Sequence, residues 1–133
     1  VAIVAINMIN DKNGRIVFIS SRASMGMPTR SAYAATKAGI HGLARTWALE
    51  LAENNITVNV IAPGPVLTQN FWDLVPKDGE LQQEISDNIP VGRIGTAEDI
   101  AHAVEFFLDK KSSFITGQIL YVCGGTSLKG LGT

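Results

Sequence analysis

Apolar residues recur in two different patterns along the first half of the chain. Residues 1–10 are apolar at positions 1, 3, 4, 6, 8 and 9, which predicts a helix that is buried on more than one side. After the turn at 11–14, residues 16–19 form an apolar run without alternation, as is typical of a strand covered on both faces. Residues 31–52 then predict a long helix, which ends at the polar cluster 53–55.

The rest of the chain continues this alternation of helix and strand. A loop is expected at 22–30, between the first strand and the long helix. Residues 57–61 predict a second buried strand, and one or two short helices are expected within 69–88. A capping threonine followed by acidic residues predicts a helix over 96–110, and the last strand is expected at 117–122.

These elements predict an α/β fold. Strands that alternate with helices are joined by crossover connections, so they run parallel within one sheet. We therefore expect a doubly wound parallel sheet of the Rossmann type, with helices on both faces. The chain has 133 residues, which fits one domain or part of one, and it contains no internal repeat, linker or low-complexity stretch.

The amino-acid composition argues against several classes of protein and of binding partner. A hydrophobic content of 46% with 17% charged residues is typical of a folded chain rather than a disordered one. The net charge of −1 gives no reason to expect a nucleic acid or an anionic membrane as partner. No apolar run approaches the ~20 residues that span a bilayer. Two histidines and one cysteine argue against a zinc site.

The single cysteine, Cys123, excludes an internal disulfide bond and suits a reducing compartment. We therefore expect a cytoplasmic protein. For the residue itself, the favoured interpretation is a small apolar side chain near a strand end.

Candidate chemistry begins with Tyr33 and Lys37, which stand four residues apart in the predicted long helix. Residues at that spacing share one helix face, so the backbone itself holds a phenol beside an ammonium. An isolated tyrosine, with a pKa of about 10, is a poor base, but a positive charge about 4 Å away contributes about 4 kcal/mol at an effective dielectric of about 20. One lysine can therefore make a tyrosine a usable acid or base. From the pair alone, the favoured interpretation is still a packed tyrosine beside a solvated lysine.

Four motifs in a fixed order resemble the short-chain dehydrogenase/reductase family, in its common single-domain form. They are the Ser20-Ser21 strand end, Tyr33-x-x-x-Lys37, Asn59-x-x-x-Pro63-Gly64 with Thr68 after it, and the closing Thr116-Gly-Gln-Ile-Leu-Tyr-Val-Cys-Gly-Gly125. The Tyr-x-x-x-Lys pattern is weak alone, but all four in register cover nearly the whole chain. Within the family, residues 59–68 are most similar to members related to 3-oxoacyl-carrier-protein reductase.

The resemblance implies roles for these residues. In the family the tyrosine exchanges a proton with the substrate oxygen, while the lysine makes that tyrosine more acidic and holds the ribose hydroxyls of the nicotinamide nucleotide. By resemblance, Tyr33 and Lys37 take these roles and the cofactor is NAD or NADP. The family's serine, which hydrogen-bonds the reacting oxygen, corresponds to Ser21 by counting along the strand and to Ser20 by counting back from Tyr33. We choose Ser21, because strands hold their register better than loops.

A turn after the second buried strand carries the other residues that the resemblance implies. In the family this turn, here Pro63 and Gly64, covers the nicotinamide, and a backbone group near Val66 and the Thr68 hydroxyl hold its carboxamide. Doubly wound folds bind ligands at such carboxyl ends of strands. The alternative is a turn that merely ends the strand, which explains the proline and glycine but not Thr68. Asn59, a polar residue in a buried strand, is expected to bond neighbouring backbone.

The resemblance also indicates what this sequence lacks. Members of the family begin with a Gly-rich turn that seats the dinucleotide pyrophosphate, and neither G-x-x-x-G-x-G nor G-x-G-x-x-G occurs here. We therefore expect residues 1–133 to be the C-terminal part of a single Rossmann-like oxidoreductase domain, without its N-terminal dinucleotide-binding half. Strands from that half should flank residues 16–19 and 57–61. The choice between NAD and NADP would also lie there.

Two interpretations of the function follow. The first is an NAD(P)-dependent oxidoreductase that interconverts a ketone and a secondary alcohol by hydride transfer, with Tyr33 as acid and base. The alternative is a non-catalytic truncated homologue or fragment that keeps the fold and an oligomer interface. Residues 71–76 are apolar and could line a substrate pocket or form a lid that packs on its own domain.

The expected partners are a small carbonyl or alcohol substrate and further copies of the same chain, as a dimer or tetramer. Small residues on the predicted long helix would allow close approach of a helix from another subunit: Ala34, Ala35, Ala38, Gly39, Gly42, Ala44 and Ala48. The alternative is tight packing of the same residues on the sheet.

Overall fold

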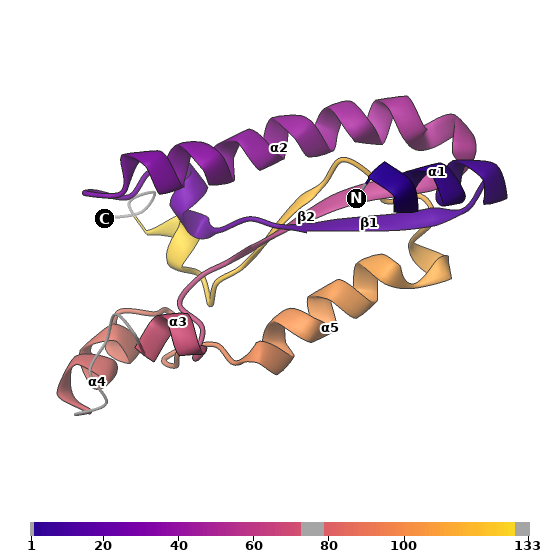
Figure 1. The fold of residues 1–133 in the computed structure, drawn as a ribbon. Helices are drawn as coiled ribbons and strands as arrows, with labels where there is room; N and C mark the ends of the chain where they lie inside the picture. The colour runs from indigo at the N-terminus through magenta and orange to yellow at the C-terminus, as the bar shows by residue number, and fades with distance from the viewer. Residues whose placement is uncertain (1, 73–78, 130–133) are drawn as a thin grey trace.

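The structure is a computed structural model that describes residues 2–72 and 79–129 (Figure 1). Its three strands are β1 (Gly14–Ile19), β2 (Ile56–Pro63) and β3 (Ile119–Val122). Its α-helices are α1 (Ala2–Asp11), α2 (Ser31–Leu51), α3 (Gln69–Trp72), α4 (Glu80–Asp87) and α5 (Ala97–Leu108). Short 3₁₀ turns are η1 (Arg22–Met25), η2 (Ala52–Asn54), η3 (Lys110–Ser112) and η4 (Thr126–Leu128).

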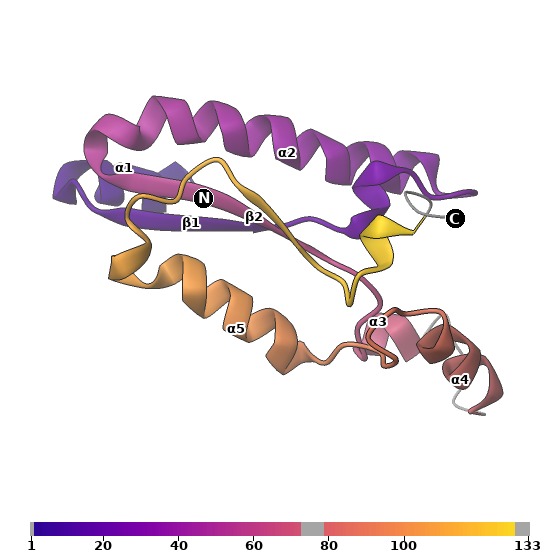
Figure 2. The same ribbon diagram turned by 180° about the vertical axis from the view of Figure 1, so that it is seen from behind.

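The described strands form one parallel sheet in the order β1-β2-β3, with Ile16 paired to Val58 and Val60 paired to Ile119. Figures 1 and 2 show α2 along one face of this sheet and α5 along the opposite face. Met8 of α1 packs on the core of the α2 face. The predicted α/β architecture, a doubly wound parallel sheet of the Rossmann type, is therefore confirmed.

The strand β2 lies at the centre of the sheet and is buried along almost its whole length. Ile56, Val58 and Val60 face α2 and pack against Ala44 and Ala48. Burying side chains of this size contributes roughly 1.5–3 kcal/mol each. Because both faces of a parallel sheet are covered, the polar residues Thr57 and Asn59 on the other face of the strand are buried as well.

One expectation about the sheet is wrong. Residues 57–61 do not need a neighbour from a missing segment, because β2 pairs with β1 on one side and with β3 on the other. The strand β1 differs, since within the described residues it pairs only with β2. Ile19, at the end of β1, is 45% exposed. Within the described residues, the edge of β1 that faces away from β2 is therefore unpaired, and the expected neighbouring strand stays a prediction.

The threonine cap that the sequence predicted begins α5, and it forms one half of a capping box. The Thr96 hydroxyl accepts a hydrogen bond from the Asp99 amide (3.4 Å), and the Asp99 carboxylate accepts one from the Thr96 amide (2.8 Å). The helix ends at Leu108 rather than near residue 110, because Asp109 leaves the helical conformation and caps η3 with its side chain.

Two other segments refine the sequence expectations. The predicted loop at 22–30 contains η1, and the region 69–88 contains two short helices, α3 and α4. Of the apolar stretch 71–76, only Phe71 and Trp72 are described, with ring centroids 5.2 Å apart, and 73–76 lie outside the described residues. Among the described helices, none has the length and apolar character needed to cross a membrane.

Candidate active site

The carboxyl ends of all three strands meet at one edge of the sheet, because the strands are parallel. The Ser20 amide, directly after β1, donates to the Ile61 carbonyl of β2 (2.7 Å). The Gly64 amide, directly after β2, donates to the Val122 carbonyl of β3 (3.0 Å). The serines that follow β1 and the Pro63-Gly64 turn that follows β2 therefore lie on neighbouring strand ends.

Tyr33 and Lys37 lie on the first turns of α2, where helical spacing holds them together. The Lys37 Nζ atom is 5.7 Å from the centroid of the Tyr33 ring, and it donates a hydrogen bond to the Ile19 carbonyl (3.0 Å). Tyr33 is 42% exposed, so it does not pack into the core. Tyr33 is therefore open to solvent, and Lys37 is hydrogen-bonded to the end of β1.

The two adjacent serines have different surroundings. Ser20 is 3% exposed, and its hydroxyl donates to the Lys37 carbonyl (2.9 Å) while lying 2.9 Å from the Nε2 atom of His41. Ser21 is half-buried, and its Oγ atom accepts a hydrogen bond from the Ala23 amide (3.1 Å), which caps η1. The Ser21 hydroxyl proton has no acceptor among the described residues.

The turn after β2 is held by tight packing and by a short parallel bridge. A Cβ atom at Gly64 would lie 2.8 Å from the Cα atom of Cys123, so no larger residue fits there. Val66 is bridged to Gly95, whose amide donates to the Pro65 carbonyl (3.0 Å) and whose carbonyl accepts from the Leu67 amide (2.9 Å). The backbone N–H and C=O of Val66 itself remain without a backbone partner among the described residues.

Thr68 has a structural role that the sequence interpretation did not include. It stands directly before α3, its carbonyl accepts from the amides of Phe71 (3.0 Å) and Trp72 (3.1 Å), and its hydroxyl accepts from the Phe71 amide (3.4 Å). A threonine in this position caps a helix. The side chain is exposed, so its hydroxyl proton also faces solvent beside the turn.

Asn59 has the structural role that the sequence predicted. It is 1% exposed, its amide nitrogen donates to the Ile115 carbonyl (2.8 Å), and its amide oxygen accepts from the Gln118 amide (3.1 Å). The Thr116 hydroxyl likewise accepts from the Val58 amide (3.0 Å). These bonds tie the segment before β3 to the central strand.

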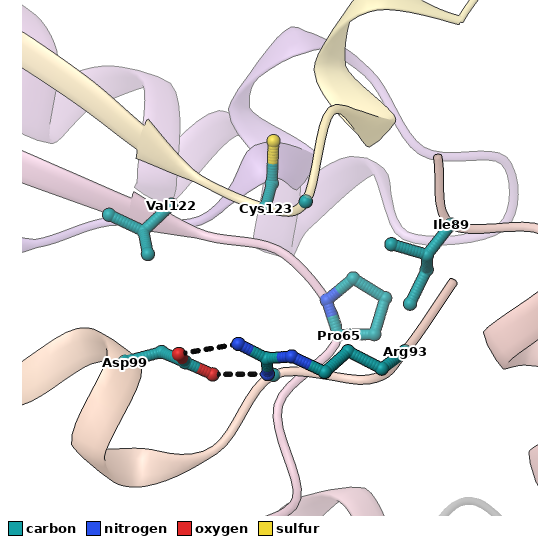
Figure 3. A pocket seen from close by; sticks show the side chains of 8 residues that line it. Pro65, Ile89, Arg93, Asp99, Val122 and Cys123 are labelled. Carbon is teal, nitrogen blue, oxygen red and sulfur yellow. Dashed lines mark hydrogen bonds and ion pairs between the residues drawn. The ribbon is translucent and has the colours of Figure 1, made fainter. Parts of the chain in front are cut away.

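A cavity of about 150 Å³ lies on the α5 side of the same sheet edge (Figure 3). Its lining residues include Pro65, Ile89, Val122 and the ion pair of Arg93 with Asp99, and do not include Ser21, Tyr33 or Lys37. The Arg93 guanidinium bonds both carboxylate oxygens of Asp99 (2.7 and 2.8 Å). Hydrogen bonds from Arg93 and from the Thr96 amide hold the pKa of Asp99 far below its usual value. The pair fastens the 89–95 loop to the start of α5.

Cys123 follows β3 and is buried, as the sequence interpretation favoured. Burial opposes ionisation of its thiol, but hydrogen bonds involving Ser127, Thr126 and Gly125 outweigh that effect and lower its pKa. Figure 3 shows its sulfur pointing away from the Arg93–Asp99 pair. Across residues 2–72 and 79–129 no group of three or more His, Cys, Asp or Glu side chains could hold a metal ion.

Sequence reasoning missed His41. It stands eight residues after Tyr33, so Tyr33, Lys37 and His41 follow one another at four-residue intervals along the same side of α2. That spacing was the available signal. The role of His41 depends on which strand end lies against this side of the helix, and the helical spacing alone does not reveal that strand end.

The fold and this strand edge define a Rossmann-like α/β protein with a Tyr–Lys pair that is bonded to the end of the strand from which Ser20 and Ser21 follow. Comparison with known proteins leads to the same class of protein. The family described as enoyl-(acyl carrier protein) reductase matches residues 1–127. The chain belongs to the short-chain dehydrogenase/reductase family and is similar to 3-oxoacyl-acyl-carrier-protein reductases.

Individual relatives cover most of this chain. The hydroxy(phenyl)methylsuccinyl-CoA dehydrogenase subunit BbsD of Thauera aromatica is 44% identical over 122 residues, which are 92% of this chain and 48% of the relative. The 3-oxoacyl-acyl-carrier-protein reductase FabG of Thermotoga maritima is 40% identical over 119 residues, or 89% of this chain and 47% of the relative. The chain therefore spans about half the length of these relatives.

A solved structure gives the same result for the fold. The gluconate 5-dehydrogenase of Burkholderia cenocepacia J2315, in complex with NADP and tartrate, superposes with a TM-score of 0.84 at 30% identity. The match covers 93% of this chain and 49% of that structure.

Proposed function

We propose that the protein is an NAD(P)-dependent oxidoreductase that interconverts a ketone and a secondary alcohol. One observation carries the proposal: the Lys37 ammonium donates to the Ile19 carbonyl and lies 5.7 Å from the centroid of the Tyr33 ring, and Ser21, two residues after Ile19, has a hydroxyl proton without an acceptor among the described residues. A cation beside a solvent-accessible phenol is the arrangement that an acid/base tyrosine requires.

The proposed catalytic residues are Ser21, Tyr33 and Lys37. In ketone reduction a hydride adds to the carbonyl carbon and Tyr33 gives its phenolic proton to the oxygen, which completes the alcohol. Lys37 stabilises the phenolate that remains, and Ser21 donates a hydrogen bond that orients the reacting oxygen. Oxidation of the alcohol runs the same transfers in reverse, with the phenolate as base.

The residues of the turn after β2 fit a nicotinamide cofactor, which would be NAD or NADP. The cofactor supplies the hydride when it is bound. We propose that Pro63, Gly64, Val66 and Thr68 hold its nicotinamide end, together with Tyr33 and Lys37. The free backbone groups of Val66 and the exposed Thr68 hydroxyl match the donors and acceptor of a carboxamide.

Relatives support this function at the level of reaction class. Their names describe a dehydrogenase, a reductase and a dehydrogenase solved with NADP. From these we infer a small carbonyl or alcohol compound as substrate. We also propose that residues 1–133 form the C-terminal part of a single Rossmann-like domain, since relatives of about twice the length are matched along nearly all of this chain.

We also propose that the protein is cytoplasmic and that it assembles with further copies of itself. Ala44 and Ala48 are used within the chain, because they are buried against the sheet. Ala38, Gly39 and Gly42 remain exposed, and a Cβ atom at either glycine would meet nothing within 4 Å. We propose that this exposed part of α2 meets another subunit in a dimer or tetramer. Light scattering on the full-length protein would measure the mass, and a monomer would contradict this part.

Transfer of deuterium tests the function directly. The full-length protein is incubated with NADH or NADPH deuterated at the transferring carbon and with a 3-oxoacyl thioester of coenzyme A. The proposal predicts deuterium on the carbinol carbon of the product, as measured by mass spectrometry. A protein that binds neither cofactor and transfers no deuterium to this ketone or to any other in a panel would instead be the non-catalytic homologue.

A further inference from the structure

A buried chain of hydrogen bonds joins Lys37 to the end of β1. The hydroxyl of Ser20, which is 3% exposed, donates to the Lys37 carbonyl (2.9 Å), and the Nε2 atom of His41 lies 2.9 Å from the same hydroxyl oxygen. All three residues belong to one local cluster, and none of these bonds is explained by the proposed reaction. The cluster lies on the side of α2 that carries Tyr33.

The chemistry of the groups determines which atom is the donor in each of these hydrogen bonds. A serine hydroxyl has one proton, and the Lys37 carbonyl can only accept, so the Ser20 proton is committed to that carbonyl. The Nε2 atom of His41 must therefore carry a proton and donate it to Ser20. Burial and the nearby Arg45 lower the pKa of His41, so the neutral ring is favoured, protonated on Nε2.

Lys37 is consequently held at both ends, by Ile19, the last residue of β1, and by Ser20, which follows it. Its ammonium donates to the Ile19 carbonyl (3.0 Å) and its own carbonyl accepts from Ser20. The Ser20 amide is in turn bonded to Ile61 of β2 (2.7 Å). The helix cannot slide along the sheet or turn about its axis without breaking at least one of these bonds. Polar groups that are hydrogen-bonded to one another in this way make their surroundings more rigid.

We propose that Ser20 and His41 are positioning residues. They fix where Lys37, and with it Tyr33 on the same helix, lies relative to the carboxyl edge of the sheet. Neither residue touches the reacting atoms. Their effect on the reaction comes from the placement of the ammonium relative to the phenol. The proposal rests on the proposed oxidoreductase function, and it gives Ser20 a role distinct from that of Ser21.

Ser20→Ala in the full-length protein is the first test. Removing the hydroxyl leaves the His41 donor without its acceptor and loosens α2, and since a displacement of 1 Å can cost about 100-fold in rate, we expect kcat/KM to fall roughly ten-fold. Ser112→Ala is a matched control, because Ser112 is 6% exposed and also donates to a helix carbonyl, that of Phe106 (2.6 Å). The control should be destabilised to a similar extent with kcat/KM unchanged.

Rescue by a conservative change separates positioning from general packing. His41→Gln places an amide N–H where the ring had Nε2–H, so it should keep kcat/KM within about three-fold of the parent. His41→Leu preserves apolar bulk without a donor and should lose as much activity as Ser20→Ala. Equal activity of the two variants would overturn the positioning role.

A spectroscopic measurement examines the hydrogen bonds without relying on activity. The sequence has two histidines, so in ¹⁵N-histidine-labelled protein the His41 signals are those that disappear in His41→Gln. We expect the Nε2–H tautomer in the parent and a mixture of tautomers in Ser20→Ala. A parent protein with the proton on Nδ1 would overturn the inference.

The outcomes distinguish this inference from the proposed function. A protein without any turnover would overturn the proposed function, and the positioning role with it. Normal turnover with equal kcat/KM for Ser20→Ala and Ser112→Ala would overturn the positioning role alone.

Discussion

At the residue scale, the site depends on the opposite directions of two neighbouring serines. Successive side chains of an extended chain point to opposite sides, and Ser21 is extended, with φ −161° and ψ 154°. Ser20 therefore points into the interior toward α2, while Ser21 caps η1 and keeps its hydroxyl proton available. A slip of one residue in this strand would exchange the two environments.

The two serines should consequently differ in their effect on catalysis. We predict that Ser21→Ala lowers kcat by about 100- to 1000-fold, the cost typical of losing one hydrogen-bond donor to the reacting oxygen. Ser20→Ala should lower it by roughly ten-fold, since it acts through position alone. Steady-state kinetics of both variants measures the difference. The assignment of Ser21 is wrong if the Ser20 variant is the more damaged.

Lys37→Met should impair both turnover and cofactor binding, because Lys37 has two proposed roles. We predict a fall in kcat of at least about 100-fold, as is typical for loss of acid/base assistance. Fluorescence titration should also give a weaker dissociation constant for the cofactor. Lys111→Met is the control, since Lys111 is exposed on η3. A cofactor dissociation constant equal to the parent's would remove the ribose role of Lys37.

Sequence alone could predict part of this site. The Tyr33–Lys37 contact follows from helical spacing, and the position of the turn at Pro63 follows from the end of a buried strand. The roles of His41 and of the Thr68 cap could not be predicted, because each depends on which backbone groups another element leaves unpaired. The different surroundings of Ser20 and Ser21 likewise depend on the packing of α2 against the end of β1, while the choice of Ser21 as the catalytic serine stays a prediction.

At the element scale, the start of α5 is fixed by charge. Asp99 caps its own helix and pairs with Arg93, and its lowered pKa means that the folded protein favours the ionised carboxylate. A carboxylate of this kind stabilises the folded state above its ordinary pKa, and the contribution is lost as the pH falls below that value.

Asp99→Asn should therefore be less stable than the parent at pH 7, with a difference that shrinks as the pH falls below about 4. Urea unfolding at a series of pH values measures this. Glu105→Gln is a matched control on the same helix, and it should unfold like the parent at every pH. A stability difference between Asp99→Asn and the parent that does not change between pH 7 and pH 3 would contradict the role of the charge.

Element boundaries were predictable where a local signal exists and not elsewhere. The start of α5 could be predicted because the side chains of Thr96 and Asp99, which are visible in the sequence, accept the two hydrogen bonds of the capping box. Its end was misplaced because Asp109 turns the chain before the two lysines that follow. The turn η1 was missed since it is stabilised by the Ser21 cap and by packing on α2 rather than by a hydrophobic pattern.

At the scale of the whole molecule, alternation of strand and helix was enough to predict a parallel doubly wound sheet. Strand order was not, because several orders satisfy the same pattern. Observing β2 between β1 and β3 makes β1 and β3 the two edge strands of the described sheet, and Ser20 and Ser21 follow the end of β1. An open edge of this kind is a place where another strand pairs.

A chain of these 133 residues expressed alone should accordingly be self-associated or poorly soluble, and it should bind NAD(H) and NADP(H) very weakly. The sequence contains no Gly-rich turn of the kind that binds pyrophosphate at a helix N-terminus. Calorimetric titration with both cofactors and light scattering measure the two properties. Micromolar binding by a soluble monomer of this length would contradict the prediction.

The central claim is that Tyr33 exchanges the proton in a hydride-transfer reaction, and Tyr33→Phe in the full-length protein tests it most directly. The change removes one hydroxyl from a ring that is 42% exposed, so folding should be unaffected by circular dichroism and by thermal unfolding. We predict that kcat for ketone reduction falls by about 100- to 10,000-fold, while cofactor binding is retained. Activity of the folded variant within a few-fold of the parent would contradict it.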